Sequence, residues 1–214
     1  MPQQYFDGLF LRHVGMGFDK QMRLADFLER SGGGDWYFDT PSARLSFGKI
    51  RFEAQILGSQ DTVNNTWMWA WANEASKLPE QALAAAQALR EFGEENQIEA
   101  FTKPLIPCDE LFTPLLVEHA GHALATIAVG VLECDAYYAA PYGKGVAFLL
   151  LKDERLERNV DNALARIVSI FPQALNAYPI ADHKLALGGY LEDFGFEPEA
   201  GDEGLSVSID GIKV

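Results

Sequence analysis

The chain has 214 residues, 48% of them hydrophobic and 22% charged, which is the composition of a globular protein rather than of a disordered one. A formal net charge of -14 repels phosphate backbones and anionic lipids, so we expect neither a nucleic acid nor a membrane as partner. The two cysteines, Cys108 and Cys134, provide no disulfide framework, and the N-terminus has no apolar export signal, so we expect a cytoplasmic protein.

The first third of the chain changes from a helical to a strand pattern. Apolar residues recur at helical spacing from 4 to 30, and because Gly15 and Gly17 interrupt them, we expect one bent helix or two. Glycines at 32–34 end this segment. The period then falls to two, which predicts strands at 36–38, 43–47 and 50–56, with Gly48-Lys49 as a short reversal.

The run Thr66-Trp-Met-Trp-Ala-Trp-Ala-Asn73 contains three of the four tryptophans at alternate positions. Successive strand side chains point to opposite faces, so a strand would place Trp67, Trp69 and Trp71 on one side. The smaller residues on the reverse would let a helix pack closely there. We therefore expect the indoles to line the opposite face as a core wall or a pocket, on the last strand of a four-strand antiparallel meander.

The remaining elements follow from similar patterns. Pro79 and Glu80 open a helix at 81–92, which Gly93 should end. An extended segment at 98–106 precedes a buried helix at 114–133, although Gly121 and Gly130 leave the second half open to a strand. We then expect a hairpin of 136–140 and 146–151, helices at 159–171 and 182–194, and a weak hairpin turning at 210–211.

These elements predict one α+β domain over residues 1–214, with an antiparallel sheet of a four-strand meander plus a hairpin and helices mainly on one face. Residues 195–214 are expected to form a weakly packed acidic extension. Between Leu185 and Ile212 there are seven acidic residues and no Lys or Arg: Glu192, Asp193, Glu197, Glu199, Asp202, Glu203 and Asp210. This end is either a solvated surface or a contact for a basic partner.

Three segments of the chain carry a family resemblance. Trp36-Tyr37-Phe38-Asp39, a strand ending in Leu57-Gly58-Ser59, and the run Thr66 to Asn73 together resemble a family of bacterial domains of unknown function that is marked by a Trp-x-Trp-Ala-Trp-Ala-Asn segment. The resemblance covers residues 35–73 and extends to the hairpin around Tyr137 and Tyr138. It implies a shared fold and assigns no catalytic residue.

The strongest catalytic candidates lie between residues 118 and 135. His119 and His122 are three apart, so they share a helical face and could seat a metal ion if a third ligand came from elsewhere, although the His-Glu-x-x-His order is absent. Cys134 could act as a thiolate nucleophile if a histidine reached it. The competing interpretation is that the histidines belong to a packed helix and that Cys134 is a buried, inert thiol.

Three functional hypotheses stay open. The first, which we favour because the chain is rich in aromatic residues and has no strong catalytic signature, is a non-enzymatic module that binds a small ligand or a protein without a cofactor. Its candidate ligand-binding residues are Trp36, Trp67, Trp69, Trp71 and Tyr137. The second is a metal-assisted or thiol hydrolase that uses His119, His122 and Cys134. The third is a structural subunit that forms a homo-oligomer through its tryptophan face.

Overall fold

A computed structural model describes residues 2–156, 163–201, 204–209 and 212–213. The α-helices are α1 (Pro2–Arg30), α2 (Glu80–Glu95), α3 (Glu99–Thr102), α4 (Cys108–Leu111), α5 (Ala120–Val131), α6 (Ala163–Ala177) and α7 (His183–Asp193). Short 3-10 helices are η1 (Ala70–Ala72), η2 (Glu74–Ser76), η3 (Val117–His119) and η4 (Glu154–Leu156).

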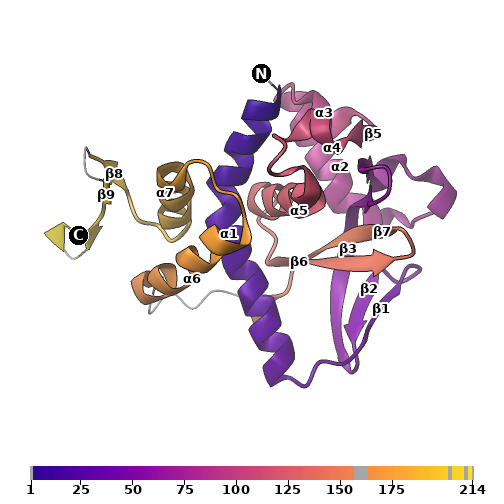
Figure 1. Cartoon of the computed structure of the whole chain (residues 1–214). Helices are drawn as coiled ribbons and strands as arrows, with labels where there is room; N and C mark the ends of the chain where they lie inside the picture. Colours follow the sequence, from indigo (N-terminus) through magenta and orange to yellow (C-terminus); the bar gives the residue numbers. More distant parts are fainter. Residues whose placement is uncertain (1, 157–162, 202–203, 210–211, 214) are drawn as a thin grey trace.

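The strands of the main sheet are β1 (Trp36–Asp39), β2 (Arg44–Phe47), β3 (Ile50–Asp61), β4 (Thr66–Trp69), β5 (Leu105–Pro107), β6 (Ala136–Tyr142) and β7 (Gly145–Leu151). They pair antiparallel in the order β1-β2-β3-β4-β5, and the β6–β7 hairpin joins the sheet through the pairing of β7 with β3. The predicted α+β class, four-strand meander and hairpin are confirmed, and β5 extends the meander by one strand. Figure 1 shows α1 between this sheet and the α6–α7 pair.

A bulge in β3 changes which residues of the strand point to each face of the sheet. Up to Ile56, the even-numbered residues of β3 face the side that carries Phe52 and Ala54, as the alternating pattern predicted. The register with β7 then shifts between Ile56 and Gly58. Beyond the shift, Gln60 points to the other side, where its Oε1 accepts a hydrogen bond from the backbone N–H of Gly121 in α5 at 2.9 Å.

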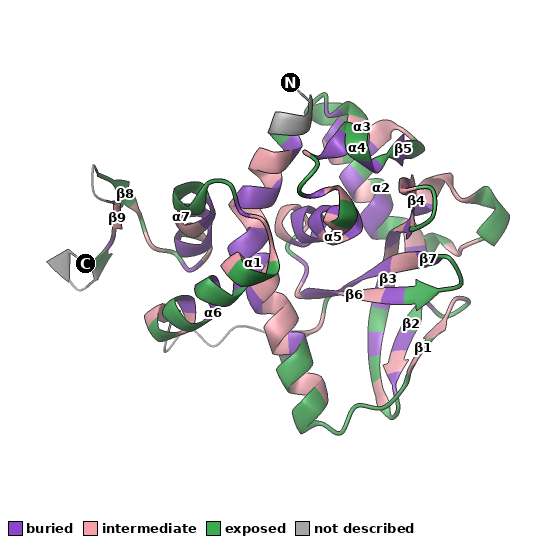
Figure 2. Ribbon diagram, viewed as in Figure 1, coloured by how far each residue is buried: buried purple, intermediate pink, exposed green. Residues whose placement is uncertain are grey.

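Each face of the sheet carries its own core. The larger core lies between the sheet and α1 and α5, and it includes Trp67, Trp69 and Phe148. The smaller core lies on the opposite face, where the C-terminal end of α1 contributes the buried Leu24. In Figure 2, α5 is mostly purple because it is buried over the larger core, while β1 is mostly pink, which marks partial burial. Helices therefore cover mainly one face.

The helix α1 continues through Gly15 and Gly17 without a break, where the sequence suggested a bend or two helices. A methyl group on Gly17 would lie 2.6 Å from Thr126 of α5, and one on Gly15 would lie 2.5 Å from Tyr190 of α7. The two glycines therefore let α5 and α7 pack closely against α1. In this case close packing, rather than helix propensity, explains glycine in a helix.

The two glycines of α5 have the same role. Gly121 lies directly against the ring of Phe148 in β7, and Gly130 lies directly against the imidazole of His13 in α1, so that no side chain would fit at either position. The second half of this segment is therefore helical, and the strand alternative is wrong. A third glycine, Gly93, was expected to end α2, but the helix runs on to Glu95 while Gly93 packs on Phe101 of α3.

The tryptophan run is only partly a strand, which corrects the prediction of three indoles on one face. Strand β4 ends at Trp69, and Trp71 lies in the following 3-10 helix. Trp71 turns toward α2, where the guanidinium of Arg90 lies 4.6 Å from its ring centroid. The helices cover the face of β4 that carries Trp67 and Trp69, rather than the face with the smaller residues.

The helices α6 and α7 pack on the side of α1 that faces away from the sheet. The predicted helix at 159–171 corresponds to α6, although its residues 159–162 lie outside the described ranges; α7 matches the second predicted helix. Arg12 of α1 donates a hydrogen bond to the carbonyl oxygen of Gly189 at 2.8 Å and forms an ion pair with Asp193 at 3.1 Å. Two short hairpins follow, β8 (Glu199–Ala200) with β9 (Leu205–Ser206), and β10 (Ser208–Ile209) with β11 (Ile212–Lys213). The predicted turn at 210–211 lies outside the described residues.

Candidate functional site

A groove of about 430 Å³ lies on the sheet face opposite the two buried tryptophans. Residues from β1, β3, β4, β6 and β7 and from the segment after β4 line it: Trp36, Phe38, Thr40, Ile56, Gly58, Ser59, Met68, Ala70, Asn73, Ser76, Leu78, Ala140, Tyr142, Ala147 and Leu149. The groove continues the smaller core toward solvent, because Leu149 and Ala140 belong to both.

The β1–β2 hairpin forms one wall because it curves over the β6–β7 hairpin. Tyr138 of β6 has its ring centroid 5.8 Å from that of Trp36 in β1 and 4.9 Å from that of Phe47 in β2. Trp36 packs against Tyr138, is half-buried and lines the groove. Its neighbour Tyr37 points away from the groove and is 65% exposed.

Small side chains form the floor. Ala140 of β6 is directly opposite Ala147 of β7, Ala147 is opposite Ser59 of β3, and Ser59 is opposite Met68 of β4. Residues opposite one another in antiparallel strands share a face, so these four side chains form one row across four strands. The row rises little above the backbone of the sheet, because three of its four side chains are Ala or Ser.

The groove is uncharged. Of the described residues that line it, none is Asp, Glu, Lys, Arg or His. Its polar side-chain groups are the hydroxyls of Thr40, Ser59 and Ser76, the phenol of Tyr142, the amide of Asn73 and the indole N–H of Trp36. The Asn73 side-chain oxygen accepts a hydrogen bond from the backbone N–H of Ser76 at 3.2 Å, which orients the amide. Such a site favours an uncharged ligand with few polar atoms.

Two of the five predicted ligand-binding residues lie deep in the larger core. Trp67 and Trp69 are both 0% exposed, with ring centroids 5.3 Å apart in an edge-to-face arrangement. The indole N–H of Trp69 donates to the carbonyl oxygen of Ala100 at 3.0 Å. The buried indole nitrogens of Trp67 and Trp71 have no hydrogen-bond partner among the described residues. Of the four tryptophans, only Trp36 lines the groove.

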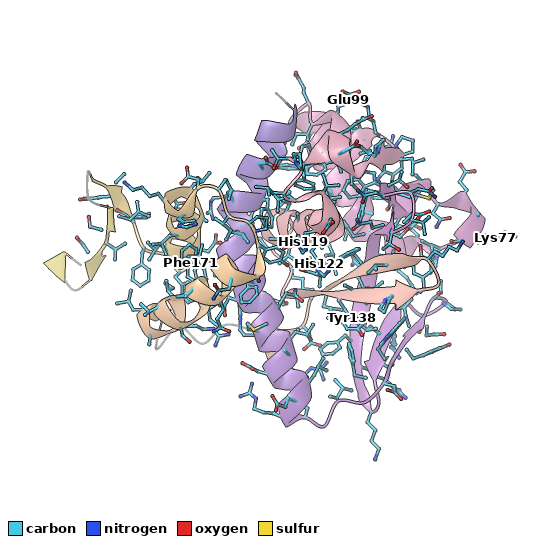
Figure 3. The ribbon with its side chains drawn as sticks, in the orientation of Figure 1. Lys77, Glu99, His119, His122, Tyr138 and Phe171 are labelled. Atoms are coloured by element: carbon cyan, nitrogen blue, oxygen red, sulfur yellow. The ribbon has the colours of Figure 1, made fainter. Side chains whose placement is uncertain are left out.

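Tyr137, the fifth predicted residue, joins a buried polar chain. Its hydroxyl lies 3.0 Å from Nδ1 of His122 and 3.5 Å from the hydroxyl of Tyr178. Burial raises the pKa of Tyr137 well above its usual value, and burial, followed by the charge of His119, lowers the pKa of His122. In Figure 3 both histidines lie between α5 and β6, whereas Tyr138 lies on the other side of β6. These hydrogen-bonding side chains therefore connect α5 to the sheet on the face opposite the groove.

The proposed metal site lacks further ligands in the described ranges, where no group of three or more His, Cys, Asp or Glu residues is arranged to hold a metal ion. His119 packs edge-to-face on Tyr178 at 5.8 Å, and His122 is next to Tyr137. The two histidines thus serve contacts between elements.

The position and the acidity of Cys134 give the thiol hypothesis little support. His119 precedes α5 and Cys134 follows it, so the helix of 12 residues separates them by roughly 18 Å. Burial raises the pKa of the Cys134 thiol to about 11, and its Sγ contacts the carbonyl oxygen of Leu132 at 3.9 Å. A thiol with a raised pKa has a smaller thiolate fraction at neutral pH, which disfavours a nucleophilic role.

Comparison with known families gives one result. The model described as "Family of unknown function (DUF6882)" matches residues 7–154, more than half of the 214-residue chain. The chain belongs to this family. No curated protein and no solved structure matches it.

The DUF6882 span contains α1 from residue 7 on, the whole main sheet and every residue of the groove, whereas α6 and α7 lie beyond it. Sequence reasoning found Trp36 but missed Met68, Ser59 and Tyr142. The alternation in the tryptophan run did place Met68 opposite the indoles, which was the available signal. No signal in the sequence pointed to Ser59 or Tyr142, because the pairing of β3 with the distant β6–β7 hairpin brings these two residues to the same groove.

Proposed function

We propose that this protein is a non-enzymatic binding module that holds an uncharged, largely apolar small molecule in the sheet groove. The lining carries the proposal: it combines the half-buried indole of Trp36, the thioether of Met68 and the phenol of Tyr142 with no charged side chain among the described residues. A charged ligand would lose its hydration there without gaining an opposite charge.

Size and composition support the same class of ligand. A volume of about 430 Å³ falls within the range of roughly 300–1,000 Å³ typical of small-molecule sites. Aromatic walls with a few hydroxyl and amide groups are also typical of such sites. Trp67 and Trp69 support the groove from the other side of the sheet without contributing surface to it.

The other hypotheses have less support. Trp67 and Trp69 are sealed within a single chain, so an oligomer is not needed to bury them. A metal-assisted hydrolase would need a third ligand beside His119 and His122, and a thiol hydrolase would need one of these histidines next to Cys134. Instead, His122 is next to Tyr137, and burial raises the pKa of the Cys134 thiol. A cytoplasmic location is part of our proposal and is supported by two free, buried cysteines. No helix in the described ranges is long and apolar enough to cross a membrane.

Nile red, an uncharged dye whose fluorescence rises in apolar surroundings, provides the test. We expect saturable binding by the wild-type protein and at least about fivefold weaker binding by Trp36→Ala, since a lost aromatic contact of this kind is worth on the order of 1 kcal/mol. Tyr37→Ala is the matched control, because Tyr37 is the adjacent aromatic residue on β1 and points to solvent. Equal affinities for the wild type and both variants would refute the assignment of the groove.

A further inference from the structure

The floor of the groove continues past its rim to the edge of the sheet. The row that runs from Ala140 through Ala147 and Ser59 to Met68 reaches a fifth strand, because Met68 is directly opposite Leu105 of β5. Leu105 therefore faces the same side as the groove, and it is 50% exposed. Five strands with four spacings of about 4.8 Å make this apolar track roughly 19 Å long.

The track is narrow as well as long. Tyr142 stands two residues beyond Ala140 on β6, and Leu149 stands two residues beyond Ala147 on β7, so both share the face of the row and flank it. Between them the floor is low and one side chain wide. This shape fits a linear chain better than a fused ring system, which is shorter and broader.

The chemistry of the track selects among linear molecules. An extended peptide binds a sheet by pairing with the unpaired backbone of an edge strand. Here the row crosses the strands, and the backbone beneath Ala147 and Ser59 belongs to β7 and β3, which already pair with strands on both sides. A peptide lying there would leave its own N–H and C=O groups without partners, which is costly next to apolar surface. An alkyl chain has no such groups.

From these observations we infer that the ligand is an uncharged amphiphile with one long alkyl chain, such as a fatty alcohol or a monoacylglycerol. The chain lies along the row from Ala140 to Leu105, and the head group meets the hydroxyls and the amide at the groove. The lack of charged side chains in the described lining and the net charge of -14 both disfavour a fatty-acid carboxylate. This inference rests on the proposed function, since it names the ligand of the same groove.

The experiment measures the displacement of Nile red by hexanol, octanol, decanol and dodecanol, with dodecanoate as the charged counterpart and naphthol as the compact ring. We expect affinity to rise roughly threefold or more with each added pair of methylenes up to dodecanol, since each newly buried methylene adds apolar contact. Dodecanoate and naphthol should bind at least tenfold more weakly than dodecanol.

Substitutions in the protein test where the alkyl chain of the ligand lies. Leu105→Ser should remove the gain from decanol to dodecanol while leaving hexanol unchanged, and Leu115→Ser, which replaces a leucine that is 69% exposed and outside the row, should leave the whole series unchanged. Ser59→Phe, which raises the middle of the floor, provides a second test and should abolish the preference for longer chains. Circular dichroism and the urea midpoint confirm that each variant is folded.

The outcomes separate the two proposals. If hexanol and naphthol displace Nile red in a manner that depends on Trp36, but affinity stops rising at octanol or Leu105→Ser behaves like Leu115→Ser, the groove binds ligands and the long-chain inference is wrong. If Nile red binding does not depend on Trp36 at all, the proposed function itself fails. Dodecanoate binding as tightly as dodecanol would overturn the uncharged head group.

Discussion

The two faces of strand β4 differ in how far their side chains are buried. On one face Trp67 and Trp69 are 0% exposed beneath the helices, with the Trp69 indole hydrogen-bonded to Ala100. On the other face Met68 lies at the groove and remains partly exposed. The most conspicuous aromatic residues of the sequence thus belong to the core, and their less conspicuous neighbour borders the candidate site.

If the proposed function holds, one face of β4 determines stability and the other determines binding. Substitutions on the covered face should mainly change the free energy of unfolding. Substitutions on the open face should mainly change ligand affinity.

Trp69→Ala should lower the free energy of unfolding by about 3–5 kcal/mol, because it leaves a large cavity and removes the partner of the Ala100 carbonyl oxygen. Urea unfolding followed by circular dichroism measures this loss. Trp36→Ala, the same substitution on the groove side, should cost clearly less. Similar losses for the two variants would contradict the division between the faces.

Gly58→Ala should cost about 1–3 kcal/mol, since the added methyl group would lie 2.5 Å from the Trp67 ring and 2.6 Å from the carbonyl oxygen of Met68. Gly8→Ala is the matched control: no atom lies within 4 Å of the added methyl, and the position is helical. Thermal unfolding should show a lower midpoint for Gly58→Ala and an unchanged or higher one for Gly8→Ala. An unchanged midpoint for Gly58→Ala would show that Trp67 does not pack on β3 as described.

Acid should lower the free energy of unfolding through His13, which lies between the helices α1 and α5 that cover the tryptophan face. Burial, followed by the charges of Arg12 and Lys20, lowers the pKa of His13 from 6.5 to about 4. Between these values the unfolded chain binds a proton that the folded chain does not, so stability falls as the pH falls from about 6.5 to about 4. By pH 5 this difference in proton binding lowers the free energy of unfolding by on the order of 1–2 kcal/mol.

This effect is measured as the difference in unfolding free energy between pH 7 and pH 5. We expect the difference to shrink in His13→Gln, which has no titrating ring next to Gly130. The same difference in the variant and the wild type would exclude His13 as the source of the acid sensitivity.

Met68→Ala should have the smallest effect on stability, about 1 kcal/mol or less, because the side chain is only partly buried. The same substitution should weaken Nile red binding several-fold, since Met68 lines the groove. Paired measurements of unfolding and dye affinity check both statements. A large loss of stability with unchanged affinity would reverse the assignment of the two faces.

Local patterns predicted most of the sheet. Alternation at 50–56 gave the faces of β3 correctly up to Ile56, and the turn residues at 143–145 marked the β6–β7 hairpin. The pattern failed at Trp71 because the end of a strand depends on what the chain packs against next, here α2 and Arg90. It also failed at Gly93, where close packing on Phe101 outweighs a low helix propensity.

The candidate site was harder to predict than the fold. Trp36 was identified because indoles recur at recognition sites, but the same reasoning also selected Trp67 and Trp69, which are buried. Which tryptophan borders the groove depends on the bulge in β3 and on the curvature of the β1–β2 hairpin, both of which are tertiary features. The row from Ala140 to Leu105 depends on the register of five strands, and its small residues carry no signal in the sequence.

The four tryptophans allow a direct test of whether the ligand binds at the groove, beside Trp36, and not at the core tryptophans. The chain has only four indole N–H groups, and ¹H–¹⁵N NMR resolves them as separate signals. On titration with dodecanol, we expect a saturable shift of the Trp36 indole signal, while the Trp67 and Trp69 signals stay in place because those rings are sealed in the core. Shifts of Trp67 and Trp69 with an unmoved Trp36 would contradict binding at the groove.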